Sequence, residues 1–171
     1  MPIGGAVIVG DKALAKKLSM LSASHQRKIS RPAIRAASAE VRKAAKRLAP
    51  RGDTGLLRKS IKNVVRTTHG IVYAVIGPAV GFKQVVNGKN VDPANYGQLV
   101  EYGTQAHTIS PKGRKGTVGT LRIGQKHLAG EVQHPGAKAK PFLRPAFDQT
   151  PSARIIQTRI WKEMDKLAKR K

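Results

Sequence analysis

Apolar residues recur at steps of three and four between Ser30 and Pro50, which is the spacing of one helical face. Pro32 fits a helix start near Ser30, because proline is tolerated in a first turn. A shorter segment rich in Ala, Leu and Lys precedes it at residues 12–24. We therefore predict a helical region over residues 12–48, ended by Pro50. The apolar face of its main helix consists of Ile34, Ala37, Val41, Ala44, Ala45 and Leu48.

Two runs rich in β-branched residues follow, one on each side of a short link that contains Gly70. This arrangement predicts an antiparallel β-hairpin over residues 61–76. Asp53 or Thr54 is expected to cap a short turn of helix that leads into the hairpin. Residues 81–95 are rich in turn-forming residues, so we predict turns there.

The last regular pattern begins at Thr150 and Pro151 and predicts a C-terminal helix over residues 150–169. The segment at residues 105–136 is rich in Gly, Lys and Arg. Because loops of that length are usually functional or disordered, we expect a long hairpin or mobile arm there. The apolar stripe of the C-terminal helix is Ile156, Ile160, Met164 and Leu167, with Trp161 beside it.

These elements predict one α+β domain that spans residues 1–171. In this fold an antiparallel β-sheet is packed by a long N-terminal helix and a C-terminal helix, and it carries the long mobile arm or hairpin. A helical turn over residues 96–102 is expected to add Leu99 and Val100 to the packing. Because aromatic residues make up only 4% of the chain, the core must rest on small aliphatic side chains. We expect a single subunit to have modest stability and to gain more from a partner.

The chain carries 33 Lys and Arg residues against 9 Asp and Glu residues, a formal net charge of +24. Residues 12–59 alone hold 14 basic and 2 acidic residues. Such a field repels other copies and attracts polyanions, which leaves nucleic acid, an acidic protein surface and an anionic membrane as partners. The longest apolar stretch, residues 71–82, is shorter than the roughly 20 residues that cross a bilayer, and we expect no membrane partner.

Residue types that carry enzyme chemistry do not cluster in this sequence. A nucleotide-binding Walker loop, a zinc-binding His-Glu-x-x-His motif and a Gly-x-Ser-x-Gly nucleophile turn are all missing. His107, His127 and His134 lack metal-ligand spacing, and we expect them to be solvated loop residues. The sequence therefore predicts no enzyme, no catalytic residue, no metal site and no cofactor.

The long helix carries basic residues away from its apolar face. These side chains either contact phosphate or form a solvated face that keeps an Ala-rich helix soluble. The overall positive charge favours a polyanion nearby. The candidate contacts to DNA or to an acidic partner are Arg35, Arg42, Lys46 and Arg47.

Three segments carry motifs: residues 49–61, residues 96–104 and residues 134–146. The first follows the long helix, the second overlaps the predicted helical turn, and the third precedes the C-terminal helix. The motif positions are Thr54, Gly55, Leu57 and Ser60 in the first segment, Glu101, Tyr102, Gly103 and Thr104 in the second, and His134, Pro135, Gly136, Pro141, Phe142 and Pro145 in the third.

Taken together and in this order, the three segments resemble the gene-product-ten-like family of siphophage minor structural proteins, which are tail-completion or neck proteins. The resemblance covers residues 12–168 of the chain. It implies a structural virion protein of a tailed phage that joins head to tail in the neck. It also implies assembly as a homo-oligomeric ring around the DNA path, which we expect to be a hexamer.

The resemblance also implies where such a protein works and what it contacts. The expected neighbours are the head–tail connector or stopper, the tail terminator or tube, and genomic DNA in the lumen. The expected location is the neck or tail of the virion, and the host cytoplasm during assembly. Charge alone supports an alternative, a sequence-nonspecific nucleic-acid-binding protein. A nuclease is disfavoured because acidic residues and metal ligands are not clustered.

Each motif also has an architectural role that follows from its residues. Gly55 and its counterparts in the other two motifs are expected to adopt backbone conformations closed to other residues. The prolines of the third motif stiffen the approach to the last helix. Phe142 and Leu143 are expected to anchor that helix to the sheet. Glu101 lies among apolar neighbours in the sequence, and we expect it to pair with an Arg or Lys.

Overall fold

The computed structural model describes residues 12–111, 119–123 and 126–169. They belong to two compact units. The first unit holds the chain up to Gly97 together with the segment from Pro141 onward, and the second unit runs from Gln98 to Lys140. The expectation of a single domain stays a prediction.

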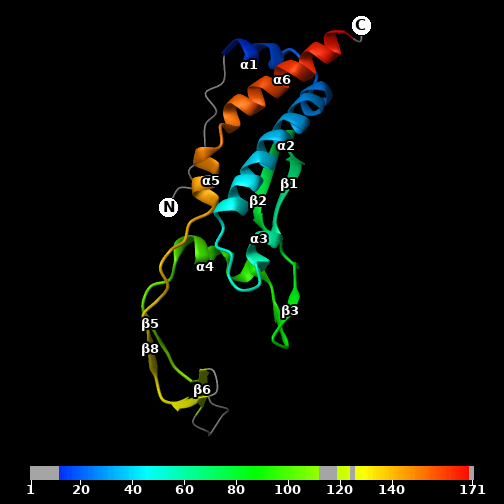
Figure 1. Cartoon of the computed structure of the whole chain (residues 1–171). Coiled ribbons are helices and arrows are strands. Elements are labelled where there is room, and N and C mark those ends of the chain that lie inside the picture. The colour runs from blue at the N-terminus through cyan, green and yellow to red at the C-terminus, as the bar shows by residue number, and fades with distance from the viewer. Residues whose placement is uncertain (1–11, 112–118, 124–125, 170–171) are drawn as a thin grey trace. The chain divides into compact units, whose positions relative to one another are not determined.

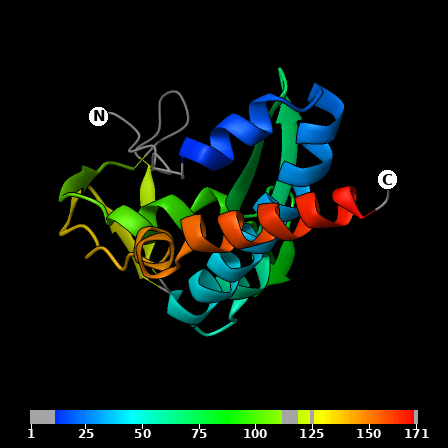
Figure 2. The ribbon, with the colours of Figure 1, turned by 90° about the horizontal axis from the view of Figure 1, so that it is seen from above.

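Two long helices dominate the first unit. Helix α2 (Ala23–Leu48) and helix α6 (Ser152–Ala168) lie against each other (Figure 1). Figure 2 shows α6 running across α2. A cluster of buried side chains joins them to the short helix α1 (Lys12–Ser19), and the predicted stripe of the C-terminal helix faces this cluster. The cluster consists of Leu14, Ile29, Ala33 and Ile160, with Leu18, Leu21, Ile156, Met164 and Leu167 packed against it.

The long helix begins at Ala23, so the predicted start near Ser30 is wrong. Pro32 lies inside α2, where it removes one backbone hydrogen bond to the preceding turn. Packing offsets this loss, because Ile29 and Ala33 lie one turn apart and are almost fully buried. Tertiary burial therefore stabilises a continuous helix across Pro32, a residue that favours a helix boundary in an isolated segment.

The predicted hairpin is confirmed as strands β1 (Ile61–Thr68) and β2 (Ile71–Pro78), which pair antiparallel (Figure 1). His69 and Gly70 form the turn with φ of 49° and 80°, the two positive values that a tight type I′ turn requires. One face of the hairpin packs on α2.

A second hairpin in the first unit was not predicted. Strands β3 (Gln84–Val86) and β4 (Lys89–Val91) pair across Asn87 and Gly88, whose φ values are 51° and 73°. Each strand has three residues, too few to produce an alternating pattern in the sequence. The turn η1 (Pro93–Asn95) follows, held by the Asp92 carboxylate, which accepts hydrogen bonds from the Gly81 and Ala94 amides at 2.8 and 3.0 Å.

A short helix, α5 (Leu143–Gln149), precedes α6 and packs against α2. It contains Pro145 in its first turn, a position that tolerates proline, and Phe142 stands immediately before it, fully buried. Phe142 therefore anchors α5. We expected it to anchor the last helix to the sheet, but that helix begins only at Ser152, because α5 lies between them.

The second unit contains most of α4 (Gly97–Tyr102) and four short strands. Leu99 is 51% exposed, so its predicted role in packing is wrong. One turn of helix can bury few of its residues, and the buried ones here are Gly97 and Glu101. The strands pair antiparallel as an outgoing and a returning stretch, β5 with β8 and β6 with β7. Their bounds are β5 His107–Ile109, β6 Thr120–Ile123, β7 Lys126–Ala129 and β8 Val132–His134.

The α+β class is confirmed, since the long helix α2 and the C-terminal helix α6 pack with small antiparallel sheets. Among the helices of the described residues, none is both long and apolar enough to cross a bilayer.

Candidate functional site

The first motif forms the joint between α2 and the β1–β2 hairpin. Its helix, α3 (Leu56–Ser60), follows Gly55, whose φ of 62° confirms the left-handed backbone expected of it. The Leu56 amide donates to the Thr54 hydroxyl at 3.3 Å just ahead of the helix, but the N-cap position is Gly55 and no side chain caps it, so the predicted cap at Asp53 or Thr54 is wrong. Leu57 and Ser60 are buried, and the Ser60 hydroxyl donates to the Leu57 carbonyl at 2.8 Å.

Arg58, inside the same motif, closes the C-terminal end of α2. Its Nε donates to the Ala49 carbonyl at 2.7 Å and its Nη2 donates to the Arg47 carbonyl at 3.1 Å. The last carbonyls of a helix lack intrahelical partners, and here a charged side chain supplies them. The motif is therefore an architectural device that fixes where the hairpin leaves the helix.

The second and third motifs meet inside the second unit. Thr104 and Ala137 exchange backbone hydrogen bonds of 2.9 and 3.1 Å, and the Thr104 hydroxyl accepts from the Ala137 amide at 2.8 Å. Gly103 and Gly136 have φ of 72° and 82°, as predicted. A Cβ on Gly103 would lie 2.5 Å from the Ala137 carbonyl oxygen, and one on Gly136 would collide with the Thr104 carbonyl oxygen. Glycine at both positions allows the two chain segments to approach this closely.

The histidines flanking this crossing also pair. His107 and His134 are opposite each other in the β5–β8 ladder, with ring centroids 5.0 Å apart. The Gly136 amide donates to His134 Nδ1 at 3.0 Å, which fixes that ring beside the turn. His107 and His134 are thus strand residues and not loop residues as expected. The side chain of His127 lies outside the described residues.

The remaining motif positions divide by exposure. Glu101 is 5% exposed, whereas its neighbour Tyr102 is 71% exposed and available to a partner. Pro135 and Pro141 are exposed at the surface. The pairing of Glu101 with an Arg or Lys stays a prediction. Burial raises the pKa of the Tyr96 phenol above its ordinary value, and the nearby Asp92 charge adds to the rise.

The outer face of the β1–β2 hairpin mixes apolar side chains with Lys62, Arg66 and Thr68. We call its apolar part the hairpin face: four side chains that alternate away from α2 and stand in two adjacent strands, with Val64 opposite Val75 in the ladder. Among the described residues this sheet has only these two strands, so both of its edges lack a strand neighbour. Exposed apolar side chains grouped on the open face of a sheet make this surface a candidate for a protein contact. The members are Val64, Ile71, Tyr73 and Val75, which are 47%, 69%, 38% and 53% exposed.

The four basic residues singled out in α2 do not form one surface. Arg35, Arg42 and Lys46 follow at steps of seven and four and so lie along one side of the helix, while Arg47 is turned about 100° from Lys46. Arg35 and Arg47 are exposed, and Arg42 and Lys46 are half-buried. Sequence reasoning grouped them because it weighed charge without the exposure of each side chain.

Arg35 belongs instead with three cations that lie nearer the start of α2. A hollow of about 530 Å³ lies there, and we call it the basic groove. Arg27 and Lys28 were missed because the helix was expected to start at Ser30, although Arg27, Arg31 and Arg35 recur every four residues. The groove is lined by Ser24, Arg27, Lys28, Arg31, Pro32, Arg35 and Thr67.

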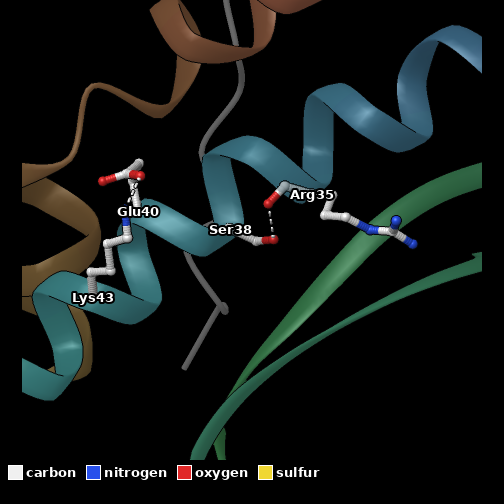
Figure 3. A network of polar contacts seen from close by, with 4 residues as sticks. All are labelled: Arg35, Ser38, Glu40 and Lys43. Atoms are coloured by element: carbon white, nitrogen blue, oxygen red, sulfur yellow. Dashed lines mark hydrogen bonds and ion pairs between the residues drawn. The ribbon is translucent and has the colours of Figure 1, made fainter.

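One acidic residue, Glu40, lies in α2, and it is occupied elsewhere. Its carboxylate binds Lys43 Nζ at 2.8 Å. Figure 3 shows this pair turned away from the side chain of Arg35. The same figure shows the Ser38 hydroxyl, which donates to the Arg35 carbonyl at 3.1 Å. The groove cations therefore keep their positive field.

Comparison with known proteins gives one family. The family model described as "Bacteriophage HK97-gp10, putative tail-component" matches residues 12–103, more than half of the chain. The matched segment contains α1, α2, the first motif and both hairpins of the first unit, and it ends at Gly103 in the second motif. No curated protein and no solved structure matches the chain.

Proposed function

The chain belongs to the HK97-gp10-like family of bacteriophage tail components, and on that premise we propose that it is a tail-completion component of the siphophage neck, where head and tail join. The role is that of a structural, non-enzymatic virion protein. Copies assemble as a ring around the DNA path, and six copies would match the symmetry of a tail.

The hairpin face is the observation that carries the ring proposal. Heterologous, head-to-tail contacts generate a closed ring, in which one surface of each copy meets a different surface of the next. Four exposed apolar side chains on a two-stranded sheet suit the first of these surfaces. Burying them against a neighbour contributes about 25 cal/mol per Å² of apolar area removed from water.

The charge of the chain explains why the ring would form only in place. A net charge of +24 on each copy opposes self-association. DNA in the lumen, or acidic surfaces of neighbouring rings, would reduce this repulsion. The proposed neighbours are the connector or stopper on the head side and the terminator or tube on the tail side, and the protein passes through the host cytoplasm before it enters the virion.

The test places one charge on the hairpin face. Val75→Asp should leave the isolated subunit folded, because Val75 is 53% exposed, but should prevent its entry into particles. Val80→Asp is the matched control, since Val80 is 90% exposed and lies outside the hairpin face. Each variant is supplied to phage that lacks the wild-type protein, and particles are examined by electron microscopy and mass spectrometry.

We expect separate heads and tails with Val75→Asp, and joined particles that contain the protein with Val80→Asp. Thermal unfolding of both purified variants must match the wild type. Normal incorporation of a folded Val75→Asp subunit would remove the hairpin face from the assembly contact. Full joining in particles that lack the protein altogether would contradict the neck role and favour a free nucleic-acid-binding protein.

A further inference from the structure

We propose that the basic groove beside the first half of α2 binds the sugar–phosphate backbone of duplex DNA without reading its sequence. The inference names the surface by which the proposed neck ring meets DNA and in that respect rests on the proposed function. The groove itself is a property of the isolated subunit, so its binding can be tested without assembly.

The groove lies between α2 and β1. At Ser38, α2 is tied to β1, because the Asn63 side-chain amide donates to the Ser38 hydroxyl at 2.9 Å. Thr67 lies four residues further along the same face of β1, and it lines the hollow of about 530 Å³ together with α2. The residues of α2 that line the groove, from Ser24 to Arg35, all precede the Ser38 contact in the helix.

The spacing of the cations suits a phosphate strand. Arg27 and Arg35 are eight residues apart, which is about 12 Å along a helix that rises about 1.5 Å per residue. One strand of B-DNA presents a phosphate about every 3.4 Å along the duplex axis, so about three to four phosphates face this length. Four cations line the same length, and three of them carry the planar guanidinium fork that binds phosphate oxygens in pairs.

The groove has charge and a donor but no acid of its own. No Asp or Glu lines it in the part of the chain that the structure describes. The Thr67 hydroxyl, at its wall, is buried and has no hydrogen-bond partner among those residues. Rotation of the Thr67 side chain toward the hollow would let this hydroxyl donate to a phosphate oxygen and so relieve the cost of an unpaired polar group.

The lining favours a DNA backbone over an acidic protein or a single strand. Protein interfaces place an apolar core inside a polar rim, and here Pro32 is the only apolar residue among seven. Proteins that hold single strands stack bases on aromatic side chains, and the lining contains none. Evenly spaced cations without base-reading or stacking groups fit phosphate contacts on a duplex.

The test compares two variants that remove the same charge. The groove variant replaces Arg27, Lys28, Arg31 and Arg35 with Gln. The control variant makes the same change at four exposed basic residues outside the groove, namely Lys43, Arg47, Lys59 and Arg66. Fluorescence anisotropy measures binding to two unrelated duplexes over a series of salt concentrations, after circular dichroism has confirmed folding.

We expect the salt slope of log affinity to become shallower by about 3 to 4 in the groove variant, because each phosphate contact contributes about −0.9. The control variant should change the slope by less than about 1. Both duplexes should behave alike. If the two variants lose the same amount of DNA affinity and salt slope, binding depends on the overall positive charge and not on the groove. An unchanged slope in the groove variant would also overturn the site. So would tighter binding of poly-glutamate than of a duplex of equal charge.

A second measurement does not depend on removing charge. Because the chain has no cysteine, Ser24→Cys in the groove lining can carry a photo-crosslinker at one position, with Val80→Cys as control. Duplex DNA should crosslink to the first and not to the second. Equal crosslinking at both positions would contradict the groove. If DNA does not crosslink to the groove but particles join normally, the groove proposal fails and the neck role stands. If DNA binds the groove but Val75→Asp leaves the particles unchanged, only the proposed ring contact fails.

Discussion

Phe142 should be among the most costly residues to truncate in the first unit. It is fully buried at the start of α5, which packs against α2. Phe→Ala at such a site removes the side chain from the core and leaves a cavity, at a cost of about 3–5 kcal/mol. For a chain of this size each kcal/mol lowers the melting temperature by about 2–4 °C, so Phe142→Ala should lower it by about 6–20 °C.

The same helix supplies the control. Phe147 is 44% exposed, so Phe147→Ala removes similar volume without opening a sealed cavity, and should cost less than about 1 kcal/mol. Urea denaturation followed by circular dichroism measures both. Because a domain holds only about 5–15 kcal/mol in all, Phe142→Ala could fail to fold. Phe142→Leu, which keeps more of the volume, then gives a smaller and measurable loss.

The reasoning fails if Phe142→Ala and Phe147→Ala unfold at the same urea concentration. That result would mean that Phe142 does not hold α5 against α2. A folded Phe142→Leu variant with wild-type stability would contradict it in the same way.

Three further outcomes follow from local geometry and charge. Gly136→Ala should abolish amide-exchange protection at Thr104, because its Cβ collides with the Thr104 carbonyl oxygen. Gly130→Ala, with φ of 101° and open space, should cost only about 1–2 kcal/mol of backbone strain and leave that protection in place. Equal protection of the Thr104 amide in the two variants would contradict the close crossing. Arg58→Ala should cost about 1.5–3 kcal/mol in urea unfolding by leaving the buried Ala49 carbonyl unpaired, and Lys59→Ala should stay within about 0.5 kcal/mol; similar losses would disprove the cap. Self-association of the free chain, measured by sedimentation velocity, should rise with salt, because the Debye length falls from about 10 Å at 0.1 M to about 3 Å at 1 M and the repulsion between copies is screened. Association that weakens with salt would show instead that charge pairs hold the copies together.

Long periodic elements were predictable from the sequence because packing and pattern agree there. The stripe of α6 faces the core cluster, and the β1–β2 hairpin has its turn at Gly70. The motif glycines were also predictable, since glycine adopts a positive φ without steric cost, and Gly55 has one. These features depend on residues close together in the chain.

Features that depend on distant contacts were not predictable. The start of α2 depends on burial of Ile29 against α1 and α6, which local propensity does not reveal. The crossing of Thr104 with Ala137 joins residues 33 apart, and no local pattern indicates that the second and third motifs meet. The basic groove was missed for both reasons, because it needs the early start of α2 and the wall contributed by Thr67.

The two faces of the β1–β2 hairpin suit two separate contacts of the proposed neck ring. Side chains alternate along β1, so Val64 points to the hairpin face while Thr67 points toward α2 and the basic groove. A contact between copies at the hairpin face would cover Lys62 and Arg66 but leave the cations of the basic groove open. Each copy added to a ring also brings +24, and that cost falls as phosphate charges enter the grooves. Ring closure would then depend on DNA. Phosphates bound in the grooves would reduce the charge repulsion between copies, and copies held together at the hairpin face would present more grooves to the same DNA.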